Sequence, residues 1–455
     1  MCKKHEFISM GEAARFLKVT KSRISQLIAG EKLEGKLVGG RRMVSVGSLE
    51  HYKRMKGSDS RRKRAERYVL MSADYEIARV TFDAQREKPL MIEKVLDADR
   101  MPFGTVSSTG SARSRNVNDW WLHRSVPDTR PGMLARLDDL GISNVRALPM
   151  RGLGLSLSDC YWLRPEGRED LAWKDVNYFD NDFEASGLDG WDEWLGAVGL
   201  DSPDNTSEGE LPKRWAIRDD RRILVKGCDT DDQRPCNEVV ASMLHRRLLD
   251  PDAYVPYELV EARGTLACVC EDFLGRREEY IPAVYVKENL GATRGLNTYD
   301  RIARYAGRWL CDEEAVRRAF SQMIVCDALI ANTDRHWRNF GFIRSVDTLE
   351  MRPAPLFDSG NSLWYAKGAA EVRNGDWSFV SRPFDNDPDR QLAVADRLDW
   401  FDGTALEGFV DEAVEVLSRS VSATQEGKLE YIAHGLRERM GAVSAAVKTL
   451  RNVVR

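Results

Sequence analysis

The hydrophobic and polar positions of residues 1–56 predict two short helices followed by a β-hairpin. Apolar residues recur at helical spacing in Ser9–Leu17 and again in Val19–Leu33, and the first segment begins with the S-x-x-E pattern of a capping box. Apolar residues then alternate with polar ones around Gly39-Gly40, as they do in a hairpin. Two helices joined by a tight turn form a helix-turn-helix, so the pattern predicts a small domain of this kind.

The rest of the chain passes from strand patterns to helix patterns. Residues 57–70 are polar and basic at their start and are predicted to form a linker. Alternation over residues 75–98 predicts a second hairpin. Three segments near the C-terminus have 3.6-residue periodicity and predict helices, namely residues 392–401, 406–420 and 430–454.

Composition excludes several classes of protein. The chain has 455 residues, of which 42% are hydrophobic and 31% charged, so it is expected to fold into two to four globular units. It contains no apolar run near 18 residues and no apolar signal-peptide core at its N-terminus, which predicts a cytoplasmic protein without a membrane partner. The eight cysteines form no C-x-x-C pair, so neither a zinc site nor a disulfide framework is expected.

The net charge of −4 conceals a basic N-terminus. Residues 1–67 hold 18 Lys and Arg against 7 Asp and Glu, a balance of +11. A basic N-terminal region on an otherwise acidic chain favours a polyanion as the partner of that region. The alternatives are a basic surface that is simply solvated and a helical hairpin that docks on another protein.

Residues 1–56 resemble the excisionase and MerR-like winged helix-turn-helix domains. That resemblance implies binding to DNA, with the second helix in the major groove and the hairpin as a wing. The residues it assigns to DNA contacts are Lys21, Ser22, Arg23 and Gln26 on the helix and Arg41 and Arg42 on the wing. Because such domains often act as pairs, a homodimer is also expected.

Five segments of the body carry candidate chemistry in a particular order. They are a Gly-containing loop at 206–217, a strand ending at Lys226, a helix with Glu238, the segment N-T-D-R-H-W-R-N and the segment F-D-S-G. The last two hold Asp334 and Asn339 in a D-x4-N arrangement and Asp358 just before a glycine. An Asp-x4-Asn pair alone carries no information in a chain of this length, but the ordered set does.

This order predicts phosphoryl transfer, in which catalysis consists mainly of positioning and charge neutralisation. Asp334 would accept the proton of the attacking hydroxyl. Asn339 and Asp358 would supply oxygen ligands to Mg²⁺. Lys226 would hold the α- and β-phosphates of ATP, and Glu238 would hold Lys226.

N-T-D-R-H-x-x-N followed by F-D-S-G resembles the HipA-like serine/threonine kinases over roughly residues 70–455. The resemblance implies an α+β, two-lobed kinase fold behind the small N-terminal winged helix-turn-helix domain. The implied divisions are an N-terminal subdomain at 71–200, a kinase N-lobe at 201–290 and a helical C-lobe at 291–455. It implies an adenine-binding hinge at Glu271, Asp272 and Phe273 and an ATP loop with Glu208, Gly209 and Lys213.

Further expectations follow from the same resemblance. A serine before the family's ATP loop can be autophosphorylated, and Thr206 and Ser207 occupy that place here. The sequence leaves open whether His336 contacts nucleotide or holds the loop, and whether Arg335 and Arg338 are solvated.

The predicted activity is that of an ATP-dependent protein Ser/Thr kinase of toxin-like or self-regulating type. The unusual loop E-G-E-L-P-K favours an alternative, a transcription regulator whose kinase fold senses ATP or is inactive. The D-R-H-x-x-N core, shared with phosphatidylinositol-type kinases, favours another, a lipid or small-molecule kinase.

Overall fold

The computed structural model describes most of the chain. The described residues are 7–17, 19, 21–29, 32–38, 41–50, 52, 66–84, 86, 88–125, 145–183, 203, 213–227, 232–262, 265–291, 295–309 and 311–454. They fall into two compact units, residues 1–66 and residues 67–455.

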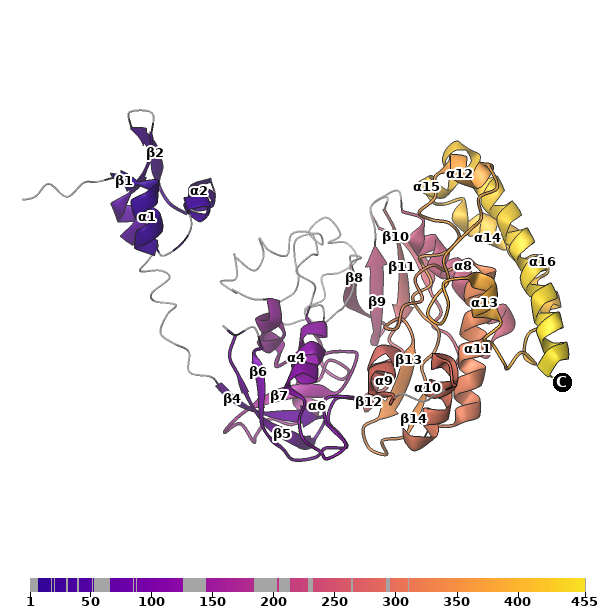
Figure 1. Cartoon of the computed structure of the whole chain (residues 1–455), viewed down its shortest axis with the longest axis horizontal. Helices are drawn as coiled ribbons and strands as arrows, with labels where there is room; N and C mark the ends of the chain where they lie inside the picture. The colour runs from indigo at the N-terminus through magenta and orange to yellow at the C-terminus, as the bar shows by residue number, and fades with distance from the viewer. Residues whose placement is uncertain are drawn as a thin grey trace, which may run out of the picture. The chain divides into compact units, whose positions relative to one another are not determined.

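The first unit has the predicted order of elements. Helices α1 (Met10–Leu17) and α2 (Lys21–Ala29) are followed by strands β2 (Gly35–Val38) and β3 (Arg41–Ser45), and β1 (Phe7–Ser9) pairs with β3 to complete a sheet of order β1-β3-β2 (Figure 1). The predicted capping box is present, because the Glu12 carboxylate accepts the Ser9 backbone N–H at 2.9 Å and the Ser9 hydroxyl accepts the Glu12 N–H at 3.3 Å.

The DNA-contact residues of this unit are only partly described. Lys21 and Arg42 are exposed, whereas the side chains of Ser22, Arg23, Gln26 and Arg41 lie outside the described residues. The assignment to a winged helix-turn-helix and the contacts with DNA therefore stay predictions.

The second unit begins with a strand that the sequence interpretation placed in the linker. Strand β4 spans Glu66–Ser72, and its last five residues are all buried. The alternation of apolar and polar residues that marks a half-buried strand is absent here, because Val69 and Met71 pack in one core while Tyr68 and Leu70 pack in another. A strand buried on both faces has a continuous apolar run. The linker predicted for 57–70 therefore ends earlier.

Residues 66–183 hold a four-stranded sheet of order β6-β5-β4-β7. The predicted hairpin is β5 and β6, and α4 packs against β6. The element bounds are β4 (Glu66–Ser72), β5 (Tyr75–Phe82), β6 (Leu90–Val95), α4 (Ser114–His123), η1 (Val145–Gly152), β7 (Tyr161–Pro165) and α6 (Trp173–Val176).

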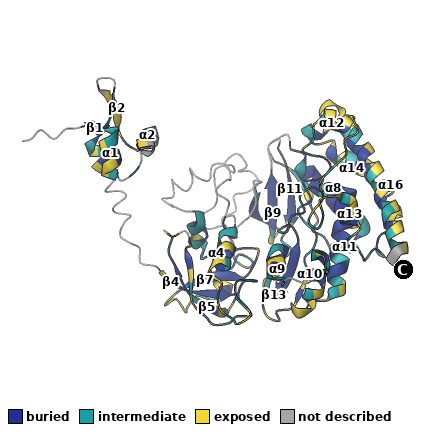
Figure 2. Ribbon diagram, viewed as in Figure 1, coloured by how far each residue is buried: buried dark blue, intermediate teal, exposed yellow. Residues whose placement is uncertain are grey.

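A second four-stranded sheet, of order β10-β11-β9-β8, carries Lys226 and the hinge. Its strands are β8 (Lys213–Arg218), β9 (Arg221–Gly227), β10 (Glu258–Ala262) and β11 (Thr265–Glu271), and helix α8 (Arg234–Leu248) packs against β10 and β11. Buried residues are concentrated in β9 and β11 and in the strand β13 and helix α11 of the next layer (Figure 2).

The remaining elements surround the loop that contains Asp334. A third sheet has the order β12-β13-β14, and helix α16 packs on α11, α12 and α14. The bounds are β12 (Glu278–Pro282), α9 (Ala283–Asn289), α10 (Thr298–Ala306), η4 (Gly307–Trp309), α11 (Glu313–Leu329), β13 (Gly341–Ser345), β14 (Met351–Pro353), α12 (Ala369–Arg373), α13 (Pro388–Leu392), η5 (Gly403–Leu406), α14 (Phe409–Leu417), α15 (Val421–Thr424), η6 (Gln425–Gly427) and α16 (Lys428–Val454).

A strand pairing crosses the lobe boundary predicted at residue 290, which stays a prediction. Strand β12 pairs with β13 from Glu278↔Ser345 to Pro282↔Gly341, so residues 278–282 lie in the same sheet as the strand that follows the Asp334 loop. The hairpin-like spacing of local strands could not predict this pairing, because its two strands are about sixty residues apart in the sequence.

The first sheet of the second unit is fixed to the third by buried polar contacts. The Arg344 guanidinium binds the Glu279 carboxylate and, at 3.0 Å, the Tyr161 hydroxyl of β7. Removing one member of such a buried polar network is costly, so these contacts hold the sheets together. At the surface, Arg277 also binds Asp347 at 2.7 Å and Asp74 at 2.8 Å, and these exposed ion pairs contribute less.

Among the described residues, no helix combines the length and apolar character needed to cross a lipid bilayer.

Candidate active site

Lys226 lies at the centre of the candidate site. Its ammonium group donates to the Glu238 carboxylate at 2.9 Å, to the Asp358 carboxylate at 2.8 Å and to the Tyr257 hydroxyl at 2.9 Å. Three donors and three acceptors leave the buried ammonium fully satisfied. The pairing expected between Lys226 and Glu238 is thus present, although Glu238 is the fifth residue of α8 and not in its first turn.

The charges of this group are mutually stabilised. Burial opposes the charge on Lys226, but the carboxylates of Asp358 and Glu238 outweigh it and raise the pKa of the ammonium well above its usual value. Burial would raise the pKa of Asp358, but Lys226 and then Lys213 outweigh it and hold that pKa below its usual value. Asp358 is therefore an anionic oxygen donor facing two lysines.

The segment around Asp358 has an unusual backbone that packs closely on α8. Asp358 adopts a positive φ of 59°, and the next residue, Ser359, donates its N–H to Glu238 at 2.8 Å. A Cβ on Gly360 would lie 3.3 Å from the Arg234 carbonyl oxygen and 3.4 Å from Glu238 Oε1. The small-residue requirement of the F-D-S-G motif thus arises from its contact with the helix that carries Glu238.

Asp334 occupies a loop that is hydrogen-bonded to the segment after Asp358. Its carboxylate accepts from the Asn361 side-chain amide at 2.7 Å, and its backbone N–H donates to Asn332 at 3.0 Å. The Asn339 amide donates to the Asp334 carbonyl at 3.0 Å, which explains the fixed D-x4-N spacing. Asp334 is partly exposed, so a substrate hydroxyl could approach it.

Arg335 is wholly buried, so the idea that it is solvated is wrong. Its guanidinium donates to Asp327 at 2.8 and 2.9 Å, to the Asn339 carbonyl at 2.8 Å and to the Ser359 hydroxyl at 2.9 Å. It also donates to the Phe357 carbonyl at 2.5 Å. One side chain therefore ties the loop of Asp334 and Asn339 to the residues on both sides of Asp358.

His336 is part of the loop structure. Its ring Nδ1 accepts the backbone N–H of Arg338 at 3.2 Å, and its backbone N–H donates to Asp334. This is the loop-holding role considered for it, and contact with nucleotide stays a prediction. Arg338 is partly buried and stacks on the Tyr285 ring with 5.3 Å from its guanidinium carbon to the ring centroid.

The hinge is joined to the Asp358 segment through aromatic rings. Phe273 stacks on Phe357, with ring centroids 5.4 Å apart, and both rings pack edge-on against Tyr280. Burial raises the pKa of the neighbouring Asp272 carboxyl to about 8. One oxygen of that carboxyl accepts from the Leu274 N–H at 3.1 Å, and the other is buried without a hydrogen-bond partner.

Part of the predicted ATP loop lies outside the described residues, namely Thr206, Ser207, Glu208 and Gly209. Lys213 at its end is described: it starts β8 and pairs directly with Lys226 of β9 in the strand register. Its charge acts on Asp358, as noted above. Lys213 and Lys226 thus bring two positive charges to one end of the sheet.

Asn339 and Asp358 suit magnesium chemically, because Mg²⁺ prefers carboxylate and amide oxygens and keeps water and phosphate oxygens for its other positions. The described residues contain no cluster of three or more His, Cys, Asp or Glu side chains suited to a metal ion.

Sequence interpretation missed three contributors: Tyr257, Asn361 and Asp327. Asn361 follows F-D-S-G directly, and its position in the motif was a usable signal. Asp327 lies eight residues before Arg335, inside an apolar helix where a lone acid indicates a buried partner. Tyr257 gave no signal, because nothing in its neighbourhood distinguishes it from a core tyrosine.

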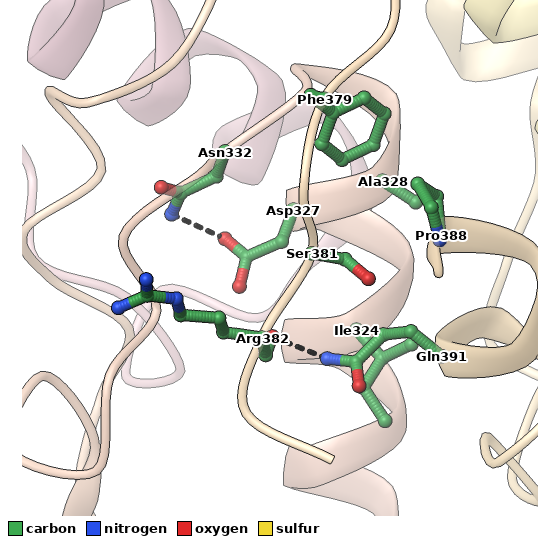
Figure 3. A pocket seen from close by; sticks show the side chains of 9 residues that line it. All are labelled: Ile324, Asp327, Ala328, Asn332, Phe379, Ser381, Arg382, Pro388 and Gln391. Carbon is green, nitrogen blue, oxygen red and sulfur yellow. Dashed lines mark hydrogen bonds between the residues drawn. The ribbon is translucent and has the colours of Figure 1, made fainter. Parts of the chain in front are cut away.

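A small cavity lies behind the Asp334 loop, between the end of α11 and residues 379–391 (Figure 3). Asp327 and Asn332 line it on one side and are hydrogen-bonded at 2.8 Å. Its volume of about 10 Å³ is at the lower limit for one water molecule. It is therefore too small to be the nucleotide site.

Comparison with known proteins relates this architecture to a class of kinases. Residues 259–425 match the HipA-like C-terminal domain. A 106-residue segment is 26% identical to the serine/threonine-protein kinase CtkA of Helicobacter pylori, and it spans 22% of this chain but only 33% of that relative. The chain thus contains a region homologous to HipA-like kinases, which supports a kinase-like function at the level of the family.

A solved structure shares the fold of this chain. HipA of Shewanella oneidensis MR-1, solved with HipB and its operator DNA, superposes with a TM-score of 0.52 at 16% identity, covering 85% of this chain and 99% of that one. The likeness to HipA shows a shared mixed α/β fold. The crystal structure of Helicobacter pylori CtkA gives a TM-score of 0.40 at 17% identity, covering 53% of this chain and 95% of that one.

Proposed function

We propose that the chain is an ATP-dependent protein kinase that phosphorylates serine or threonine hydroxyls. The observation that carries the proposal is the Lys226 ammonium held between Glu238 and Asp358 at 2.9 and 2.8 Å. A lysine paired to a helix carboxylate beside a metal-binding aspartate is the arrangement that positions ATP phosphates. The relationship to HipA-like kinases supports the same reading.

The nucleotide would lie between the hinge and the Lys226 group. The backbone of Glu271, Asp272 and Phe273 would meet the adenine, and Lys226 and Lys213 would face the phosphates. Asp358 accepts one hydrogen bond from the Lys226 ammonium. A phosphate oxygen that replaced it would keep the buried ammonium satisfied, so ATP binding need not leave an unpaired charge.

Asp334 would act as the base. As the hydroxyl oxygen of the substrate bonds to the γ-phosphorus and the bond to the β-bridging oxygen breaks, the hydroxyl proton passes to the Asp334 carboxylate. The Asn361 amide at 2.7 Å holds that carboxylate in place. Asn339 and Asp358 would hold Mg²⁺, which when bound neutralises phosphate charge.

Radiolabelled Mg-ATP tests this proposal. We expect label to appear on the wild type or on an added protein substrate and to be lost in Asp334→Asn. The matched control is Asp399→Asn, because Asp399 is an exposed acid that pairs with Arg318, which is also exposed. If neither the wild type nor the Asp399→Asn control becomes labelled although both still bind ATP, the result would favour an ATP-sensing regulator. Label only on a lipid or small hydroxyl compound would favour the second alternative.

We also propose that the N-terminal unit binds DNA. Its support is the +11 balance of residues 1–67 and the exposed Lys21 and Arg42 on the second helix and the hairpin. Fluorescence anisotropy with duplex DNA should show affinity that falls steeply with salt. Arg41→Ala/Arg42→Ala should weaken binding and flatten the salt dependence, whereas unchanged binding would contradict a role for the hairpin.

Autophosphorylation at Thr206 or Ser207 is proposed as the control of this activity. A phosphate would add about two negative charges next to a loop that has to receive ATP. Phosphopeptide mapping after incubation with Mg-ATP tests it, and an unmodified 206–207 peptide from active protein would exclude it.

A further inference from the structure

We propose that Tyr257 is a positioning residue that orients the Lys226 ammonium toward the phosphates of a bound nucleotide. This inference rests on the proposed function. Tyr257 is buried, with 7% of its surface exposed, and its hydroxyl accepts from Lys226 Nζ at 2.9 Å. The ammonium nitrogen also lies 4.8 Å from the centroid of the Tyr257 ring.

The direction of the ammonium follows from counting its protons. An ammonium group has three N–H bonds in fixed tetrahedral directions. The Glu238 carboxylate takes one and the Tyr257 hydroxyl takes a second. The third then points toward Asp358, whose carboxylate accepts it and whose side chain is partly exposed. Glu238 alone would leave the ammonium free to rotate.

The backbone around Tyr257 is held firmly enough for this role. The Tyr257 N–H donates to the Ser242 hydroxyl of α8 at 2.9 Å. Residues Tyr254 and Leu356 form a parallel bridge, and Val255 donates to the Leu356 carbonyl at 2.8 Å. Two segments that run side by side in one direction thus deliver Tyr257 and Asp358 to the same ammonium group.

Nucleotide binding to the full-length protein tests the inference. Equilibrium dialysis would compare ATP and adenosine for the wild type, Tyr257→Phe and Tyr299→Phe. We expect Tyr257→Phe to raise the Kd for ATP by about tenfold, the worth of one hydrogen bond to a charged group, and to leave the Kd for adenosine unchanged. Tyr299→Phe is the matched control, because its buried hydroxyl binds Asp396 and the Arg317 carbonyl in the helical region.

A double-variant cycle separates positioning from a structural effect. In a Lys226→Met background, Tyr257→Phe should cause no further loss of ATP binding, because the hydroxyl acts only through the ammonium. Equal weakening of ATP and adenosine, an additive loss in the Lys226→Met background, or unchanged ATP binding in Tyr257→Phe would each overturn the inference. ATP that binds without phosphoryl transfer would instead contradict the proposed kinase activity.

Discussion

Arg335 and Asp327 form a two-armed ion pair in the interior, with Nε–Oδ2 and Nη2–Oδ1 distances of 2.8 and 2.9 Å. The side chain of Arg335 is fully buried and that of Asp327 nearly so. Asp327 lies on helix α11, and the Arg335 guanidinium lies between the loop that holds Asp334 and the segment that holds Asp358. We therefore expect the pair to position the candidate catalytic residues from the interior.

Arg335→Lys should abolish phosphoryl transfer and lower the free energy of unfolding by about 3–5 kcal/mol, because a buried acid loses its forked partner. Denaturant unfolding and labelling with ATP would measure both. Arg318→Lys is the control: its pair with Asp399 has a similarly short contact of 2.7 Å but is solvent-exposed, and such pairs contribute about 0–1 kcal/mol. Equal losses in the two variants would contradict the positioning role of Arg335.

Gly360→Ala should reduce phosphoryl transfer on the order of 10- to 100-fold, the effect of a misplaced catalytic group. The added methyl would press on Glu238 Oε1, the atom bound to Lys226, and on the rigid Arg234 carbonyl. Steady-state kinetics would measure the loss. Gly307→Ala serves as control because a Cβ there meets nothing within 4 Å, and it should leave the rate unchanged.

Two glycines on helix α16 should respond oppositely to alanine. A Cβ on Gly435 would lie 2.6 Å from the Trp377 ring and 2.9 Å from the Trp364 ring, so Gly435→Ala should destabilise by about 1–3 kcal/mol. Gly441 has open space, so Gly441→Ala should stabilise by about 0.5–1 kcal/mol through helix propensity. Thermal unfolding of both variants checks the sign. If Gly435→Ala proved stabilising, the two tryptophan rings would have to move away from the added methyl group at little cost in free energy.

Asp272→Asn should change how stability depends on pH. The folded-state pKa of Asp272 is about 8, far above that of an unfolded aspartate, because burial disfavours the carboxylate. The folded state therefore holds the proton more tightly, and this contribution to stability is lost as pH rises toward 8. Between pH 5 and 9, the free energy of unfolding should fall more steeply with rising pH for the wild type than for Asp272→Asn, by at most about 1.4 kcal/mol per pH unit. Parallel curves would contradict it.

The order of motifs was enough to predict one of the charged pairs at the site. The type and order of their segments anticipated the contact of Lys226 with Glu238, whereas the contact of Lys226 with Asp358, expected only as a magnesium ligand, was not predicted. Periodicity likewise predicted the helices and the hairpin of the first unit, because local spacing determines which face is apolar. The roles of these residues in catalysis and of the head on DNA stay predictions.

What the sequence could not predict depends on distant partners. Arg335 looks like a solvated arginine in a polar segment, and only the fold reveals Asp327 and the two carbonyl oxygens around it. Strand β4 was assigned to the linker because its two faces enter different cores. The pairing of strand β12 with β13 was also not predicted, because helices α9, α10 and α11 and the Asp334 loop separate the two strands in the sequence.

The contact of Arg344 with Tyr161 and Glu279 has a practical consequence for dissecting the gene. A shortened protein starting at residue 201 would retain every described motif residue, but it would uncover the Arg344 guanidinium and the strand surface that β7 occupies. Such a fragment should aggregate or fold poorly, whereas a fragment starting at residue 66 should retain these contacts and fold. The sheet of residues 66–183 is thus part of the folding unit that contains the candidate site and should not be removed from it.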